Sequence, residues 1–247
     1  MSDTENIGVE HGPAAVAAAT RRGFLLLGLG LLAGCAKQTT RAMLPNPPWP
    51  SLDTPPLVTP PDKWTGYKPP APEPLPPSWR GTVLARNKWA RGRPIPSRMN
   101  RMSPIRYITI HHDGMAPFFK IDQTSTAARI EAIRRAHRGR GWGDIGYHFV
   151  VDRAGRAWEA RPMSYQGAHV KDHNFANIGI VALGNFDQQQ PSRAQLNTVQ
   201  HLLGELMSSY RVPTSRVRTH QEWAATACPG RHLQDYMDRS RQLGRLG

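Results

Sequence analysis

A dense run of prolines limits where this chain can fold. Residues 45–80 hold 14 of its 23 prolines, including the stretch PPAPEPLPP. Proline has no backbone donor for a helix or sheet, so such a segment stays extended, at about 3.1 Å per residue where it is polyproline-like. We therefore predict a linker over residues 36–80 and one folded domain over 81–247, which is long enough for a single core.

The segment before the linker, residues 1–35, has the pattern of an export signal. Arg21 and Arg22 precede a short apolar run, and small residues follow this run up to Cys35. The apolar run is too short to cross a bilayer core of about 30 Å. TRRGFL resembles a twin-arginine signal, and LAGC resembles a bacterial lipobox. We expect a lipid on Cys35; the alternative is an ordinary signal peptide with an incidental cysteine.

These signals predict a lipoprotein of the cell envelope that faces the periplasm. Acyl chains on Cys35 would anchor the protein to a membrane, and the linker, whether semi-rigid or disordered, would hold the domain away from it. Ala36 and Lys37 lack the aspartate that typically retains lipoproteins in the inner membrane, which favours the outer membrane. We expect a monomer.

The formal net charge of +14 suggests a polyanionic surrounding. Nucleic acid, anionic lipid and a carboxylate-rich cell wall all fit this charge. The basic stretch 128–142, ARIEAIRRAHRGRGW, is the best candidate for a nucleic-acid patch, but export disfavours such a partner. Ile130 and Ile133 mark one side of this stretch as the buried side of a helix. We therefore predict a solvated basic helix face and no nucleic-acid partner.

Alternating strand and helix patterns predict an α/β domain with a mixed central β-sheet flanked by helices. Runs rich in β-branched and apolar residues predict strands, and DRAG with Gly155 predicts the turn of a hairpin. The predicted strands and hairpin cover residues 105–112, 146–162, 177–185 and 216–220.

Three helices are predicted between and after these strands. The first starts at a cap provided by Thr124, Ser125 or Thr126 and stops at Gly139 or Gly141. The second covers 191–212, with Ser192 as its cap and apolar residues at three- and four-residue spacing. The third begins near Pro229.

Histidines at strand ends and a lone cysteine indicate metal chemistry. His111 and His112 close the first predicted strand, His220 ends the last one, and Cys228 follows it. If Cys35 is lipidated, Cys228 has no partner for a disulfide. Zinc binds imidazole and thiolate, and a catalytic zinc site uses three protein ligands and leaves one position open. Side-chain alternation along a strand cannot choose between His111 and His112.

Four segments resemble the type-2 N-acetylmuramoyl-L-alanine amidase family, whose fold is shared by phage lysozyme-type amidases and peptidoglycan recognition proteins. They occur in the family's order and spacing over about residues 103–236. The segments are ITIHHDG, GWGDIGYHFVVD, GAHVKDHNFANIGIVALGN and THQEWAATACPG. The resemblance implies Zn²⁺ as the cofactor, with His111, His220 and Cys228 as its ligands.

The resemblance also implies roles for residues around the metal. Tyr147 matches the family's catalytic tyrosine, beside the water that zinc activates, and Thr226 takes a catalytic position that other members fill with lysine or threonine. His169 and Asn174 fall where the family lines its substrate groove. For His169, an ordinary surface histidine is the alternative.

One departure separates this chain from part of the family. Some relatives use an aspartate as the third ligand and a glutamate general base in the strand that matches NIGIVALG. That strand here offers Val181 and Leu183 and no acid. The departure and Cys228 are typical of the phage and recognition-protein branch, and they leave proton transfer to Tyr147 or to the zinc-activated water.

The resemblance implies an enzyme, a zinc hydrolase of the linear amide between N-acetylmuramic acid and L-alanine of the stem peptide. A zinc-activated water would attack the amide while Tyr147 and Thr226 hydrogen-bond the developing oxyanion. Peptidoglycan is the expected substrate, and arginines near the groove would bind its carboxylates. The alternatives are a non-catalytic peptidoglycan-binding lipoprotein of the same fold and a structural tether between membrane and wall.

Overall fold

The computed structural model describes residues 83–246, so the predicted signal 1–35, Cys35 and the linker 36–80 lie outside the described residues. A six-stranded sheet runs through this part of the chain in the order β1-β4-β3-β5-β2-β6. All neighbouring strands pair in parallel except β3 and β4, which form an antiparallel hairpin. The strands are β1 (Val83–Leu84), β2 (Tyr107–His112), β3 (Phe149–Val151), β4 (Ala157–Glu159), β5 (Asn177–Ala182) and β6 (Val217–Thr219).

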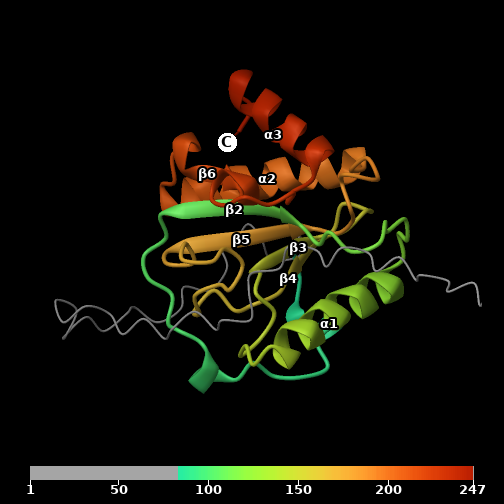
Figure 1. Cartoon of the computed structure of the whole chain (residues 1–247), viewed down its shortest axis with the longest axis vertical. Coiled ribbons are helices and arrows are strands. Elements are labelled where there is room, and N and C mark those ends of the chain that lie inside the picture. The colour runs from blue at the N-terminus through green and yellow to red at the C-terminus, as the bar shows by residue number, and fades with distance from the viewer. Residues whose placement is uncertain (1–82, 247) are drawn as a thin grey trace, which may run out of the picture. The chain divides into compact units, whose positions relative to one another are not determined.

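Helices cover both faces of the sheet. Helix α1 packs on one face, and α2 lies on the other with α3 outside it (Figure 1). The α-helices are α1 (Gln123–Gly139), α2 (Arg193–Tyr210) and α3 (Arg231–Gln242). Short 3-10 turns are η3 (Arg86–Lys88), η4 (Pro96–Arg98), η5 (Thr214–Arg216) and η6 (His220–Glu222). This arrangement confirms the predicted mixed sheet with flanking helices. Among residues 83–246, no helix is both long and apolar enough to cross a membrane.

The sheet separates two hydrophobic cores. On the α2 side, Ile108 and Ile110 of β2 are fully buried against Val199, Leu203 and other apolar residues of α2. On the α1 side, Ile130 and Ile133 pack with Trp158 and Val181 of the sheet. Because side chains alternate along a strand, burial of Ile108 and Ile110 toward α2 turns His111 toward the α1 side.

Local signals set the ends of most elements correctly. Ser192 caps α2 in a capping box with Gln195, as predicted, and Gly155 adopts a left-handed conformation (φ +80°) in the turn of the β3–β4 hairpin. The predicted cap of α1 was wrong. Asp122 caps that helix by accepting the backbone N–H of Ser125 (2.7 Å), because a carboxylate one residue before the helix reaches an orphan donor of the first turn.

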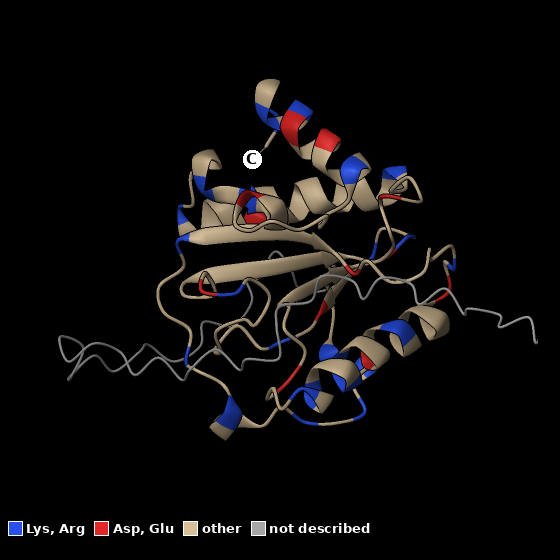
Figure 2. Ribbon diagram, viewed as in Figure 1, with Lys and Arg blue, Asp and Glu red and all other residues tan. Residues whose placement is uncertain are grey.

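The basic face of α1 is less solvated than its sequence suggests. Four arginines, Arg129, Arg134, Arg135 and Arg138, lie along the helix from its second turn to its last (Figure 2). Arg134, however, is only 9% exposed and pairs with Glu131 at 2.7 and 2.8 Å, while Arg129 binds both oxygens of Asp113 at 2.9 Å. The prediction of a solvated face is therefore wrong for these two arginines. Arg134 meets the carboxylate three residues before it on the same helix, whereas Arg129 meets a carboxylate outside the helix, which the helix pattern does not reveal.

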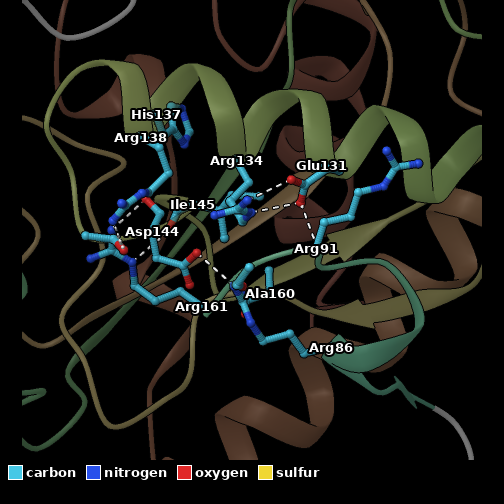
Figure 3. A network of polar contacts seen from close by, with 12 residues as sticks. Arg86, Arg91, Glu131, Arg134, His137, Arg138, Asp144, Ile145, Ala160 and Arg161 are labelled. Carbon is cyan, nitrogen blue, oxygen red and sulfur yellow. Dashed lines mark hydrogen bonds and ion pairs between the residues drawn. The ribbon is translucent and has the colours of Figure 1, made fainter. Parts of the chain in front are cut away.

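A polar network joins the N-terminal end of the domain to the loop that precedes Tyr147 (Figure 3). Arg86 contacts the Asp144 carboxylate at 2.9 Å and the carbonyl of Ala160 at 2.6 Å. Arg161 donates to the carbonyls of Ile145 (2.6 Å) and Asp144 (3.2 Å). These bonds hold the backbone on the N-terminal side of Tyr147.

Candidate metal centre

Three side chains from distant parts of the chain meet at the carboxyl ends of strands β2 and β6. They are His111 on β2, His220 at the start of η6, and Cys228 in the loop before α3. All three are buried, and one ligand atom of each lies within 4.8 Å of the others. The strand register explains the meeting. Ile110 of β2 pairs in parallel with Thr219 of β6, so the residues that follow them emerge side by side.

The two adjacent histidines of β2 have different surroundings. The His111 Nδ1 atom lies 3.6 Å from Cys228 Sγ. The His112 Nδ1 atom instead accepts the backbone N–H of Phe186 (3.2 Å), and the His112 ring lies against the Phe186 ring with centroids 6.1 Å apart. His112 therefore stays outside the ligand group, and the structure makes the choice that alternation left open.

Contacts with its own loop and with η6 hold the backbone of Cys228 in place. Its N–H donates to the Thr226 hydroxyl (3.2 Å), and its carbonyl accepts the N–H of Gln221 (2.9 Å). Gly230, two residues later, has a φ of +83°, and a Cβ there would lie 2.6 Å from the carbonyl carbon of Phe186. Only glycine combines this φ with so close an approach, so it lets the cysteine loop pack against the Phe186 backbone.

A carboxylate and an arginine fix the turn that carries His220. Glu222 and Thr219 form a capping box, in which the Glu222 carboxylate accepts the Thr219 N–H at 2.5 Å. Arg241 of α3 binds both oxygens of Glu222 at 2.7 Å. Helix α3 thus supports the ligand turn through a bidentate ion pair.

His169 is buried beside the ligand group but outside it. Only 3% of its surface is exposed, and its Nδ1 lies 3.0 Å from His111 Nε2. Its Nε2 lies 3.2 Å from the carbonyl oxygen of Asn177. The alternative of an ordinary surface histidine is therefore wrong, because the ring is buried on the face of the sheet, against His111 of β2 and Gly179 of β5.

Asn174 holds the loop that begins at His169. Its side-chain oxygen accepts the backbone N–H groups of His169 (2.7 Å) and Val170 (2.9 Å), and 5% of the residue is exposed. These bonds give Asn174 and His169 clear structural roles. Contact of either residue with substrate, as the resemblance implies, stays a prediction.

Tyr147 lies next to the ligands, two residues before β3. Its ring centroid is 5.1 Å from that of His111, and 5% of the residue is exposed. Burial, with a further contribution from Cys228, raises the pKa of the Tyr147 phenol well above its usual value. Tyr147 therefore keeps its proton at neutral pH and can donate a hydrogen bond.

Burial also sets the protonation of the three candidate ligands. It lowers the pKa of His111 well below its usual value and that of His220 to about 4, so both imidazoles are neutral at pH 7. Burial raises the pKa of the Cys228 thiol. A bound cation would favour the thiolate, because metal binding couples to loss of the thiol proton.

Comparison with known proteins places this geometry in a family. The sequence profile described as N-acetylmuramoyl-L-alanine amidase matches residues 101–231, more than half of the chain. The chain belongs to this family. The finding confirms the resemblance to type-2 amidases and peptidoglycan recognition proteins, and it makes this amidase-family protein a peptidoglycan hydrolase or a peptidoglycan-binding protein.

Relatives of this amidase-family protein include both peptidoglycan-recognition proteins and amidases. The chain is 36% identical over 155 residues to a peptidoglycan-recognition protein of Drosophila simulans, covering 62% of this chain and 84% of that protein. It is 32% identical over 150 residues to an N-acetylmuramoyl-L-alanine amidase of Homo sapiens, covering 60% of this chain but 25% of the human protein.

A solved structure shows the same fold with a ligand. Peptidoglycan recognition protein LE, in complex with tracheal cytotoxin (a monomeric diaminopimelic acid-type peptidoglycan), is similar with a TM-score of 0.58 and 26% identity. The similarity covers 64% of this chain and 93% of that one.

Several residues around the centre of this amidase-family protein escaped the sequence analysis. Glu222 and Arg241 support His220, and the Asn177 carbonyl supports His169. One of them had a local signal, since THQE is a capping-box sequence that places Glu222 three residues after Thr219. Asn177 acts through its backbone carbonyl, and Arg241 acts through a contact with another segment of the chain. Neither interaction has a local sequence pattern.

Proposed function

We propose that this protein is a zinc-dependent amidase that cleaves the bond between N-acetylmuramic acid and L-alanine of the peptidoglycan stem peptide. One observation carries the proposal: His111, His220 and Cys228 come together in a buried group within the amidase-family fold. A neutral phenol, Tyr147, lies beside this group.

The three residues fit zinc better than other common cations. Two imidazoles and one thiolate form a set of nitrogen and sulfur ligands that occurs in catalytic zinc sites, whereas Mg²⁺ and Ca²⁺ prefer oxygen ligands. Three protein ligands also leave a coordination position for a small molecule. When bound, zinc would supply a Lewis acid and lower the pKa of water toward about 7.

The residues of the chain supply the remaining requirements of amide hydrolysis. The Tyr147 hydroxyl keeps its proton and can donate to the carbonyl oxygen of the scissile amide as negative charge develops on it. The Thr226 hydroxyl accepts the Cys228 N–H and retains its own proton for a second donation. One well-placed donor of this kind contributes about 3–4 kcal/mol to the transition state.

Product analysis tests the proposal directly. Protein lacking residues 1–35 should carry about one zinc per chain and release stem peptides with free L-alanine amino termini from purified peptidoglycan. A chelator should abolish the release, and added zinc should restore it. Mass analysis that finds muropeptides with every stem peptide still attached would contradict the amidase proposal.

The second candidate is a non-catalytic peptidoglycan-binding protein of the same fold. It is favoured by the similarity to recognition proteins, one of which is solved with a peptidoglycan fragment bound. Binding of muropeptides by zinc-loaded protein, without any release of stem peptide, would support this candidate over the enzyme.

We also propose that the protein is a monomeric lipoprotein of the outer membrane, anchored through Cys35. The support is the sequence pattern of residues 1–35, with arginines, a short apolar run and LAGC. Mass analysis of the mature N-terminus should find an acylated Cys35, and Cys35→Ala should abolish acylation. A mature chain that starts elsewhere and carries no lipid would contradict it.

A further inference from the structure

A buried histidine that is not a candidate ligand contacts the candidate metal centre. The His169 ring lies 5.0 Å from the His111 ring and 6.3 Å from the Tyr147 ring, measured between centroids. Its two nitrogens face His111 and the carbonyl oxygen of Asn177. His169 contacts the Nε2 atom of His111, whereas Cys228 Sγ faces the other ring nitrogen, Nδ1.

The directions of these hydrogen bonds follow from chemistry. A carbonyl oxygen only accepts, so the Asn177 contact requires the proton of His169 on Nε2. A neutral His169 then accepts at Nδ1, and His111 must donate from Nε2. Neutrality is favoured because an imidazolium buried at this depth would be costly. His111 Nδ1 is left with a free lone pair directed toward the ligand group.

The neighbouring His148 does not compete for either bond. Its Nδ1 accepts the backbone N–H of Gly179 (3.0 Å), so its proton lies on Nε2, which donates to the carbonyl of Tyr165 (3.0 Å). The two buried histidines, His148 and His169, therefore have separate hydrogen-bond partners, and each set includes a backbone group of β5.

Two glycines and a strand hold the His169 ring in place. A Cβ on Gly167 or Gly179 would lie 2.4 or 2.5 Å from His169 Cδ2, so both positions leave the space that the ring fills. Asn177, whose carbonyl receives the His169 proton, is the first residue of β5 and pairs with Tyr107 of β2. The acceptor is thus part of the same sheet that carries His111.

We propose that His169 is a positioning residue that holds His111 in the tautomer and orientation in which Nδ1 binds zinc. The proposal rests on the proposed zinc function. Groups that orient a metal-binding histidine typically change metal affinity by about 10- to 100-fold when they are removed. His169 would do this through a second imidazole backed by a strand carbonyl.

Zinc affinity of matched variants tests the proposal in the full-length protein purified in detergent. His169→Leu removes the acceptor and should raise the zinc dissociation constant by about 10- to 100-fold, measured by competition with a chelator. His169→Asn places an acceptor oxygen near the position of Nδ1 and should recover most of the affinity. Val199→Ala, in the core on the other face of the sheet, controls for lost stability and should bind zinc normally. Unchanged affinity in a folded His169→Leu protein would overturn the proposal.

Imidazole ¹⁵N spectra of the metal-free wild-type protein give a readout that needs neither zinc nor a stable variant. His111 should be protonated on Nε2 and not on Nδ1, and His169 likewise. A His111 proton on Nδ1 would overturn the proposal even if the variants fail to fold. If the spectra agree but wild-type protein binds no zinc, the proposed amidase function fails while the hydrogen-bond assignment stands.

Discussion

The Nδ1 atom of His111 lies 3.6 Å from the sulfur of Cys228, although 117 positions separate the two residues in the chain. Strand β2 presents the histidine, and the loop that packs against Phe186 presents the thiol. With His220 they form a buried group whose donor types suit zinc. Both the group and the contacts that support it can be tested by substitution.

Replacing the thiol should remove the metal. We expect Cys228→Ser to reduce bound zinc well below one per chain and to lower amidase activity at least about 100-fold, because a serine hydroxyl does not ionise as readily as a thiol. Metal analysis and product assays measure the two effects. Cys35→Ser is the matched control and should keep zinc; full activity of Cys228→Ser would exclude the sulfur as a ligand.

Removing the Tyr147 hydroxyl should separate catalysis from metal binding. Tyr147→Phe should keep zinc and lower kcat by about 10²- to 10³-fold, which corresponds to the loss of one oxyanion donor. Tyr236→Phe removes a hydroxyl that contacts Gln200 on α2 and should leave kcat unchanged. If Tyr147→Phe turns over at the wild-type rate, the phenol has no part in the reaction.

The ion pair between Arg241 and Glu222, which supports the turn that carries His220, should affect zinc affinity more than folding stability. Arg241→Met should weaken zinc binding several-fold by releasing Glu222, because the carboxylate orders the turn that carries His220. The pair is partly exposed, so unfolding free energy should fall by only about 0.5–1 kcal/mol. Arg239→Met, exposed on the same helix, provides the comparison. Equal zinc affinities in the two variants would contradict this support role.

Two glycine substitutions should have opposite effects on stability. Gly230→Ala should lower unfolding free energy by about 1–3 kcal/mol or more, since its φ of +83° and the 2.6 Å approach to Phe186 exclude a side chain. Gly139→Ala, at the end of α1, meets no atom within 4 Å and should be neutral or stabilising by up to about 1 kcal/mol. Urea unfolding measures both, and similar results for the two would refute the packing argument.

Acid should destabilise the metal-free domain. Burial lowers the pKa of His137 and of His148 to about 3, whereas an unfolded histidine titrates near 6.5. Between these values the unfolded chain binds more protons, so unfolding free energy falls as pH falls, by up to about 1.4 kcal/mol per pH unit for each group. Buried Asp113 and Asp144 have raised pKa values and oppose the trend at lower pH.

The clearest test lies between about pH 7 and 5.5, in chelator, where ordinary carboxylates remain ionised. Urea unfolding should show the loss there, and exposed His201→Gln should show the same slope as wild type. An unfolding free energy that stays constant across this range would contradict neutral burial of the histidines.

Local pattern was sufficient to predict most elements and the candidate ligand types. The β-branched and apolar run over residues 105–112 predicted a buried strand, and the spacing of apolar residues after Ser192 predicted α2. These predictions succeed because the period of buried side chains depends on neighbours within a few residues. The prediction of the α1 cap failed because several polar residues near the start of the helix can accept from the same backbone donors. In the structure, Asp122 is the residue that does so.

The sequence by itself determined the alternating strands and helices, and it marked His220 and Cys228 as metal-binding residue types. The family resemblance favoured His111 over His112 as the third residue, but only the tertiary structure shows the physical reason, since the Nδ1 of His112 accepts a hydrogen bond from Phe186, 74 positions away. The tertiary structure also decided that His169 lies beside His111 and that Arg129 of α1 pairs with Asp113 outside the helix. The physical reason is that these outcomes depend on partners that packing brings close, and residue spacing along the chain does not encode those partners.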